Sequence, residues 1–178
     1  MKTPDRMTGA ELATMRQACG LSREELAQLC DVQPRTVKHW ESGRAGVPAD
    51  VAQTIGGISS GIRDSVRAAC DVLARDRPAQ LVLIRYRTDA DMQRFRPDCV
   101  GMLAASTHGA IVARTIDAIG LLPALQGIRA RVVWFDPADY ERWRQDAGQA
   151  DSKATRQAWA AGQVAAQAMP HKGDQPAG

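Results

Sequence analysis

Residues 20–43 read GLSREELAQLCDVQPRTVKHWESG, and this segment constrains the fold more than any other part of the chain. Ser22 and Glu25 have the S-x-x-E spacing of a capping box, in which the hydroxyl and the carboxylate each satisfy a free backbone N–H at a helix start. Asp31-Val32 then supplies a short break. The segment therefore predicts a short helix that ends at a tight turn.

A second short helix is predicted to begin at Gln33-Pro34, because proline at the first helical position loses no intrahelical hydrogen bond. Val37 and Trp40 are three residues apart and share one face of this helix. The opposite face is polar and cationic, with Arg35, Lys38, His39 and Ser42. Gly43 follows, as a C-cap residue would. Two short helices with a tight joint, the second apolar inside and cationic outside, make a helix-turn-helix whose outer face can enter a DNA major groove.

These residues resemble the helix-turn-helix of phage-repressor-type (Cro/CI, or XRE) regulators, in which an L-S-x-E-E-L-A segment is followed by a T-V-x-x-W-E-x-G segment. The resemblance covers about the first third of the chain. The closing WESGRAGVPADV is similar to the regulators associated with anti-CRISPR operons (Aca) and their relatives. The resemblance implies an N-terminal DNA-binding domain and a C-terminal dimerisation domain.

The way this motif docks indicates which side chains meet DNA. The fork of Arg35 can make two bonds to guanine O6 and N7, and His39, four residues on, can contact a base or a phosphate. Gln33 can offer its amide to a phosphate or to adenine, while Lys38 and Arg44 suit phosphates. With the motif threonine, the candidate DNA-binding residues are Gln33, Arg35, Thr36, Lys38, His39 and Arg44. The alternative for each is a solvated surface side chain.

Three further residues are assigned structural roles. Trp40 is a core residue, together with Leu12, Leu26, Leu29, Val32 and Val37. The resemblance implies that Glu41 pairs with an arginine of the first helix, and Arg16 matches that position. The pair would tie the first helix to the recognition helix, and the alternative is an exposed Glu41.

Helix signals flank the central motif. Thr8 and Glu11 form another capping box, which predicts a first helix that stops at Gly20. After the motif, a long helix is expected from Pro48 to about Asp76, with its apolar stripe at Val51, Ile55, Ile58, Ile62, Val66, Ala69 and Leu73. Gly56-Gly57 and Gly61 each weaken it by roughly 1 kcal/mol relative to alanine, which predicts a kink or break. The stripe is either packing within one chain or the seam of a dimer.

Beyond Pro78 the pattern changes to strand, helix, helix, strand, helix. Strands are expected at 81–87 and 128–135, short helices at 88–96 and after Asp136, and a helix capped by Ser106 that ends at Gly120. This order predicts a small α+β domain. A two-strand sheet has a free edge that invites pairing with a second copy, which favours a dimer.

The fold class expected is α+β, mainly α, in three parts: a helix-turn-helix domain with a long helix at 1–77, an α+β dimerisation domain at 78–146, and a weakly helical to disordered tail at 147–178. Within the tail, Ser152 is expected to cap a weak helix. The 178 residues and the 44% apolar fraction suffice for one small domain plus a second.

Composition excludes several classes of function. No apolar run reaches a membrane span and the N-terminus lacks a signal-peptide core, so a cytoplasmic protein is expected. Cys19, Cys30, Cys70 and Cys99 are far apart and have no companion histidines, so neither a metal nor another cofactor is expected. The three histidines, His39, His108 and His171, are isolated from any plausible nucleophile, and an enzyme is not expected.

The function predicted is a homodimeric, sequence-specific transcriptional regulator that binds a palindromic DNA operator as a repressor, and by resemblance controls its own operon. Two other functions stay open. The chain could be the antitoxin of a toxin–antitoxin pair, in which the C-terminal part sequesters a toxin, or a regulator that also binds RNA. The aromatic content of 4% argues against a stacking platform for single strands.

Overall fold

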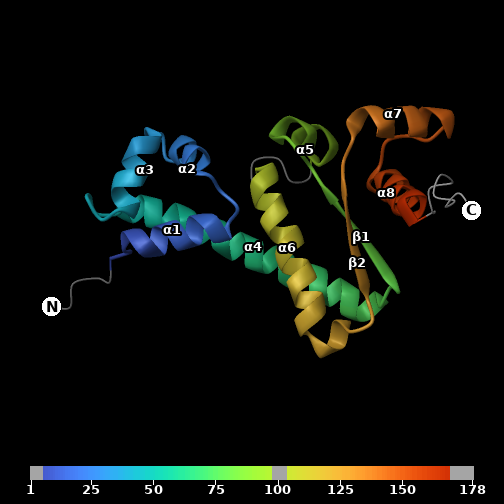
Figure 1. Ribbon diagram of the computed structural model, residues 1–178, viewed down its shortest axis with the longest axis horizontal. Coiled ribbons are helices and arrows are strands. Elements are labelled where there is room, and N and C mark those ends of the chain that lie inside the picture. The colour runs from blue at the N-terminus through green and yellow to red at the C-terminus, as the bar shows by residue number, and fades with distance from the viewer. Residues whose placement is uncertain (1–5, 98–103, 169–178) are drawn as a thin grey trace, which may run out of the picture.

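The computed structural model describes residues 6–97 and 104–168 of the chain. The helices are α1 (Gly9–Ala18), α2 (Arg23–Leu29), α3 (Pro34–Glu41), α4 (Ala49–Asp76), α5 (Asp89–Phe95), α6 (Ala105–Leu121), the 3-10 helix η2 (Pro123–Leu125), α7 (Pro137–Asp146) and α8 (Lys153–Ala168), and the strands are β1 (Gln80–Arg85) and β2 (Arg129–Trp134). Figure 1 shows α1–α3 gathered around one end of α4, and α6 crossing the other half of α4 on the side where the remaining elements lie. The predicted class, α+β and mainly α, is confirmed. None of the described helices is long and apolar enough to cross a membrane.

The N-terminal helices begin and end where their capping residues dictate. Thr8 and Ser22 are the N-caps of α1 and α2, and both capping boxes are complete. Gln33 is the N-cap of α3, although its side chain makes no capping hydrogen bond, and Pro34 is the first helical residue. Gly43 follows α3 with a φ of +74°, a left-handed conformation that glycine adopts without steric cost.

These helices bury an aliphatic core around Trp40: Leu12, Leu26, Val37, Val47, Val51, Ile55 and Ile62. The prediction that Leu29 joins this core is wrong, because its side chain is 55% exposed. Leu26 and Ala27 are the buried residues of α2. Leu29 lies roughly 110° around the helix from the midpoint of that pair, outside the face that α3 covers.

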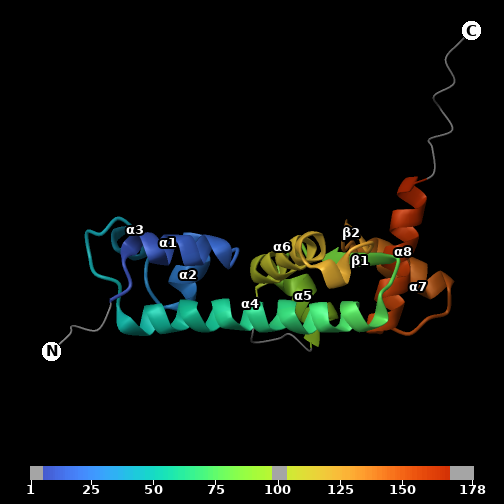
Figure 2. The ribbon, with the colours of Figure 1, turned by 90° about the horizontal axis from the view of Figure 1, so that it is seen from below.

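Helix α4 runs unbroken for 28 residues, so the kink expected at Gly56-Gly57 and Gly61 is absent (Figure 2). A Cβ added at any of these glycines would meet no neighbouring atom within 4 Å, so no packed element forces a bend there. Two side chains of the apolar stripe are fully buried, Ile55 just before the glycines and Ile62 just after them. Burial on this scale offsets the roughly 1 kcal/mol that each glycine costs a helix. The stripe therefore packs within the chain.

The two strands are parallel, with a register from Gln80↔Arg129 to Arg85↔Trp134, and α5 and α6 form the crossover. Successive side chains of a strand point to opposite faces of the sheet. Val82 and Val133 face an aromatic core built with Phe95, Phe135, Tyr140 and Trp159. Leu81 and Ala130 face a smaller cluster that contains Leu73 of α4 and Ile119 of α6.

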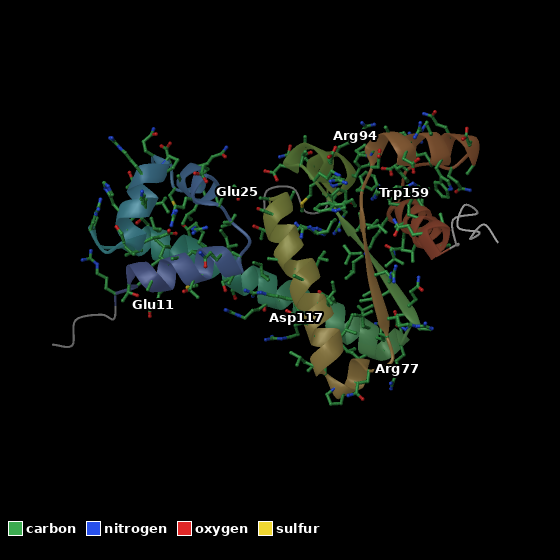
Figure 3. The ribbon with its side chains drawn as sticks, viewed as in Figure 1. Glu11, Glu25, Arg77, Arg94, Asp117 and Trp159 are labelled. Atoms are coloured by element: carbon green, nitrogen blue, oxygen red, sulfur yellow. The ribbon has the colours of Figure 1, made fainter. Side chains whose placement is uncertain are left out.

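Helix α8 is a packed part of the fold, which differs from the weakly helical tail expected after residue 146. Trp159 is 2% exposed and lies in the aromatic core beneath α7 (Figure 3). The Gln157 amide also donates to the Val82 carbonyl on β1 at 2.6 Å. Ser152 caps the helix as expected, since its hydroxyl accepts from the Thr155 N–H.

Helix α6 contacts both halves of the molecule. The expectation that Ser106 caps it is wrong: the N-cap is Ala104, and Ser106 lies inside the first turn. The Ser106 hydroxyl instead donates to Glu25 of α2 at 2.7 Å. Arg114, two turns further on, donates to the Ala18 carbonyl at the end of α1 at 2.9 Å. The helix-turn-helix is thus attached to the C-terminal part by α4 and by these contacts.

Candidate nucleic-acid interface

The inner face of α3 is held tightly by its neighbours. Val37 is fully buried and Trp40 is 6% exposed. The first residue of α1, Gly9, lies so near the end of α3 that an added Cβ would be 2.2 Å from the Trp40 carbonyl oxygen. Because this contact involves backbone rather than a flexible side chain, it fixes how closely α1 crosses α3. The recognition helix therefore has one orientation relative to the rest of the domain.

A buried ion-pair network also fixes α3. The Glu41 carboxylate accepts hydrogen bonds from Arg16 Nε and Arg23 Nε, both at 2.6 Å. The Arg16 and Glu41 side chains are only 8% and 4% exposed. Arg16 also donates from Nη1 to the Leu21 carbonyl at 2.6 Å. Thus the Arg16–Glu41 pair implied by the motif is present, and it links α1, the α1–α2 turn and α3.

The charge state of Glu41 follows from this network. Burial alone would raise the pKa of Glu41, because a carboxylate loses hydration on burial. The hydrogen bonds and positive charges of Arg16 and Arg23 outweigh burial and hold the pKa below its ordinary value. Glu41 is therefore an anion inside the domain, and its charge is neutralised away from the outer face of α3.

The outer face of α3 and its flanks present the predicted DNA-binding side chains. Five of the six are exposed and Thr36 is half-buried: Gln33, Arg35, Thr36, Lys38, His39 and Arg44. Within the described residues, none of these six side chains makes a hydrogen bond or ion pair with the protein. Their contacts with DNA stay a prediction.

The spacing of the cations suits a groove. Arg35 and His39 are four residues apart and Arg35 and Lys38 three, so they share one side of α3. The backbone N–H groups of Arg44 and Ala45 both donate to the His39 carbonyl, which keeps Arg44 beside the C-terminal end of the helix. An α-helix fits the major groove of B-DNA, and arginine can there bind two atoms of guanine. This side of the domain can thus bring base-reading and phosphate-binding groups to one duplex.

Some structural residues of the site were not predicted. Arg23 is the second partner of Glu41, and no sequence signal distinguishes it from an ordinary exposed arginine at a helix start. Gly9 could have been found, because glycine in the first turn of a well-capped helix is unfavourable and points to a close backbone contact. Glu25 was predicted as a capping residue, whereas its second link, to Ser106, depends on a residue far along the chain.

No group of three or more His, Cys, Asp or Glu side chains in the described part of the chain is arranged to hold a metal ion. Cys19 is buried, and Cys30 and Cys70 are half-buried. Burial raises the pKa of all three thiols, which favours the neutral thiol over the metal-binding thiolate. Cys99 and His171 lie outside the described residues.

Comparison with known proteins bears on the N-terminal part. Residues 8–81 match a family described as a helix-turn-helix domain. The match begins at the N-cap of α1 and ends just inside β1, so it covers all four N-terminal helices. It supports a DNA-binding regulator of the helix-turn-helix type. No curated protein matches the chain.

Proposed function

We propose that this protein is a homodimeric, sequence-specific transcriptional repressor of the XRE type, related to the Aca regulators, which binds a palindromic operator in its own promoter. One observation carries the proposal: the cations on the outer face of α3 have no partner among the described residues, while the only carboxylate of α3, Glu41, is turned inward to Arg16 and Arg23. A surface arranged in this way attracts phosphates and leaves the arginine fork of Arg35 available for a base.

The distribution of charge supports specific rather than general DNA binding. The chain carries 23 lysines and arginines against 20 aspartates and glutamates, a formal net charge of +3. Such a mild excess gives weak attraction to DNA over the whole molecule. Binding then depends on the cations placed locally on α3 and after it, above all Arg35, Lys38 and Arg44.

The C-terminal part supports a dimer. In the described residues β2 pairs only with β1, which leaves its other edge open. Val132 and Trp134 on β2 are 44% and 49% exposed. The guanidinium groups of Arg85 and Arg87 lie over the Trp134 ring, at 5.1 and 4.6 Å from its centroid. An open edge with exposed apolar side chains favours pairing with a second copy. Two recognition helices would then read two half-sites one turn of DNA apart.

Selection of bound sequences from random duplex DNA by the full chain tests the proposal. We expect enrichment of a palindrome with half-sites about 10 base pairs apart, centre to centre. Lys38→Ala should then weaken binding to all duplexes alike and reduce the salt dependence by about one unit per protomer. Failure to enrich any sequence would contradict sequence-specific binding.

The dimer is tested by light scattering on the full chain. A carboxylate at the β2 edge should oppose pairing, so Val132→Asp should lower the mass to that of one protomer. Leu121→Asp is the matched control, because Leu121 is 78% exposed and belongs to α6 rather than to the strand. A wild-type protein with the mass of a monomer would contradict the dimer, as would a Val132→Asp variant that keeps the mass of two protomers.

A further inference from the structure

A pocket of about 730 Å³ lies between the C-terminal half of α4, strand β1, α6 and the first turns of α8. Figures 1 and 2 show α6 and the start of β1 next to this half of α4. Its walls are mainly aliphatic, with Ala69 and Val72 from α4, Leu83 from β1, and Ile111 and Val112 from α6. Pockets of this size with apolar walls and a few polar groups are where proteins hold small organic molecules.

The charged side chains that line the pocket in the described part of the chain all have one sign. Its ionisable side chains include Arg96, Lys153 and Arg156, and among the described residues no aspartate or glutamate lines it. Arg156 is 7% exposed, and its guanidinium bonds Asp151 at 2.5 Å, so its charge is already compensated. Lys153 is exposed and has no ion pair in the described part of the chain. The pocket therefore complements an anion with an apolar body.

We propose that this pocket binds a small organic anion, of the class of medium-chain carboxylates. The apolar body would lie against Val72 and Ile111, between α4 and α6. The carboxylate would lie near the ammonium group of Lys153, which is otherwise without a counter-charge. The attraction between the carboxylate of the ligand and the ammonium group of Lys153 gives the preference for an anion over a neutral molecule of the same shape.

The walls of the pocket lead to the DNA-binding helices. Helix α4 lines the pocket with Ala69 and Val72, and its N-terminal half supplies Val51 and Ile55 to the helix-turn-helix core. Helix α6 lines it with Ile111 and Val112 and bonds the helix-turn-helix through Ser106 and Arg114. A bound anion would act on both connections, so we expect it to change the affinity for DNA. This regulatory part rests on the proposed function; binding of the anion does not.

Binding is tested by calorimetric titration of the full chain, without DNA, with decanoate below its micelle concentration. We expect one decanoate per chain. Decanol and decyltrimethylammonium have the same alkyl chain without the negative charge, and each should bind at least fivefold more weakly. Equal affinity for the three compounds would overturn the proposal, as would binding of several decanoates per chain without saturation.

Two pairs of variants place the ligand in the pocket. Val72 is 45% exposed, so a polar substitution leaves the cores intact. Val72→Glu should weaken decanoate binding at least tenfold relative to Val72→Gln, because only the charge differs. Lys153→Gln should weaken it about two- to fivefold, the range of an exposed charge pair. Arg67→Gln removes the same charge from an exposed site on α4 outside the pocket and should leave the affinity unchanged.

Other outcomes contradict the site. If Val72→Glu and Val72→Gln bind decanoate equally, the anion binds elsewhere. If decanoate does not bind and Val72→Glu instead halves the mass seen by light scattering, the face is an interface between copies. For the regulatory part, saturating decanoate should change the affinity for the selected duplex at least threefold in the wild type and not in Val72→Glu. An unchanged affinity beside normal decanoate binding would overturn regulation alone.

Discussion

The recognition helix α3 and the C-terminal helices α5, α7 and α8 differ in how their arginines are used. In the C-terminal half every arginine of α5, α7 and α8 is paired with a carboxylate: Arg94 and Arg144 with Glu141, Arg142 with Asp139, and Arg156 with Asp151. In the N-terminal half two arginines converge on the single buried carboxylate of α3, Glu41. Arg35 and Lys38 on the same helix stay without a partner in the described residues. The ion pairs of the C-terminal helices stabilise the fold, whereas the unpaired cations of α3 leave positive charge available for a ligand.

The two halves also differ in the side chains that form their hydrophobic cores. The C-terminal core is aromatic, with Phe95, Phe135, Tyr140 and Trp159 packed edge to face at centroid distances of 4.6–6.0 Å. The N-terminal core is aliphatic around a single Trp40. Aromatic side chains bury large areas and fix their own packing geometry. The small N-terminal core therefore depends more on its capping boxes and its buried ion pair to hold α3 in place.

The largest effect is expected from removing the buried carboxylate. Glu41→Ala leaves Arg16 buried without a counter-charge, and the free energy of unfolding should fall by about 3 kcal/mol. Glu141→Ala is the control in the other half: Glu141 also bonds two arginines, but at 19% exposure, and the expected loss is about 1 kcal/mol or less. Urea unfolding measures both. Equal losses of unfolding free energy in the two variants would show that burial of Glu41 makes its ion pair no more important for stability than that of Glu141.

A double-mutant cycle separates the ion pair from packing. Arg16→Met combined with Glu41→Leu removes both charges and keeps apolar volume, so the double variant should be more stable than the sum of the single losses predicts. Urea unfolding of the four proteins gives the coupling. A coupling free energy near zero would indicate that Arg16 and Glu41 act independently.

The same ion pair should make the protein sensitive to acid. The pKa of Glu41 is lower in the folded state than its ordinary value of 4.5, so the folded protein binds the proton less readily than the unfolded chain. Its stabilisation is fully present above about pH 4.5 and is lost as the pH falls through the lowered pKa. Urea unfolding at pH 7, 5, 4 and 3 should show that the free energy of unfolding declines less with falling pH in Glu41→Gln than in the wild type. Parallel declines would contradict the assignment.

The next effect concerns the free cations. Arg35→Ala should remove discrimination at one base pair of each half-site, at a cost of about 1–3 kcal/mol per half-site. Arg94→Ala removes an arginine that is 64% exposed but paired with Glu141 in the other half, and it should leave DNA binding unchanged. Fluorescence anisotropy with the selected operator and a scrambled duplex compares the two. Retained discrimination in Arg35→Ala would show that α3 does not read bases through this residue.

What the sequence could predict was local. The capping boxes at Thr8 and Ser22 join residues three apart, and the turn at Gly43 needs only a left-handed glycine, so each could be read from a short window. The Arg16–Glu41 pair is distant in the chain, and it was predicted only because the motif fixes the relative position of the two helices.

What the sequence could not predict depended on surfaces far apart in the chain. Helix α8 was expected to be weak because Trp159 stands among alanines and glutamines; the aromatic core that buries it is built from α5, α7 and the strands. The absence of a kink in α4 likewise depends on partners, because packing along Ile55 and Ile62 outweighs the propensity of the glycines. Helix propensity alone accounts neither for the burial of Trp159 nor for the packing along α4.

The smallest effect is expected at the junction of the halves. Ser106→Ala removes a hydrogen bond to Glu25, whose other oxygen keeps its bond with the Ser22 N–H at 2.6 Å. The carboxylate therefore stays partly satisfied, and the loss in the free energy of unfolding should be about 1 kcal/mol. Ser65→Ala removes an exposed hydroxyl that bonds only the Gly61 carbonyl of its own helix, and it should change stability by less than about 0.5 kcal/mol.

Urea unfolding of the Ser106→Ala and Ser65→Ala variants measures the difference, and the double variant Glu25→Gln/Ser106→Ala tests whether the two groups act together. A loss for Ser106→Ala that disappears in the Glu25→Gln background would place the effect at this hydrogen bond. If the Ser106→Ala and Ser65→Ala variants lose the same free energy of unfolding, the Ser106–Glu25 hydrogen bond adds nothing measurable to stability. The helix-turn-helix would then be joined to the rest by α4, by the Arg114–Ala18 hydrogen bond and by the apolar contacts of Ala110 and Ile111 with its core. Any signal from the C-terminal half would have to pass through those contacts.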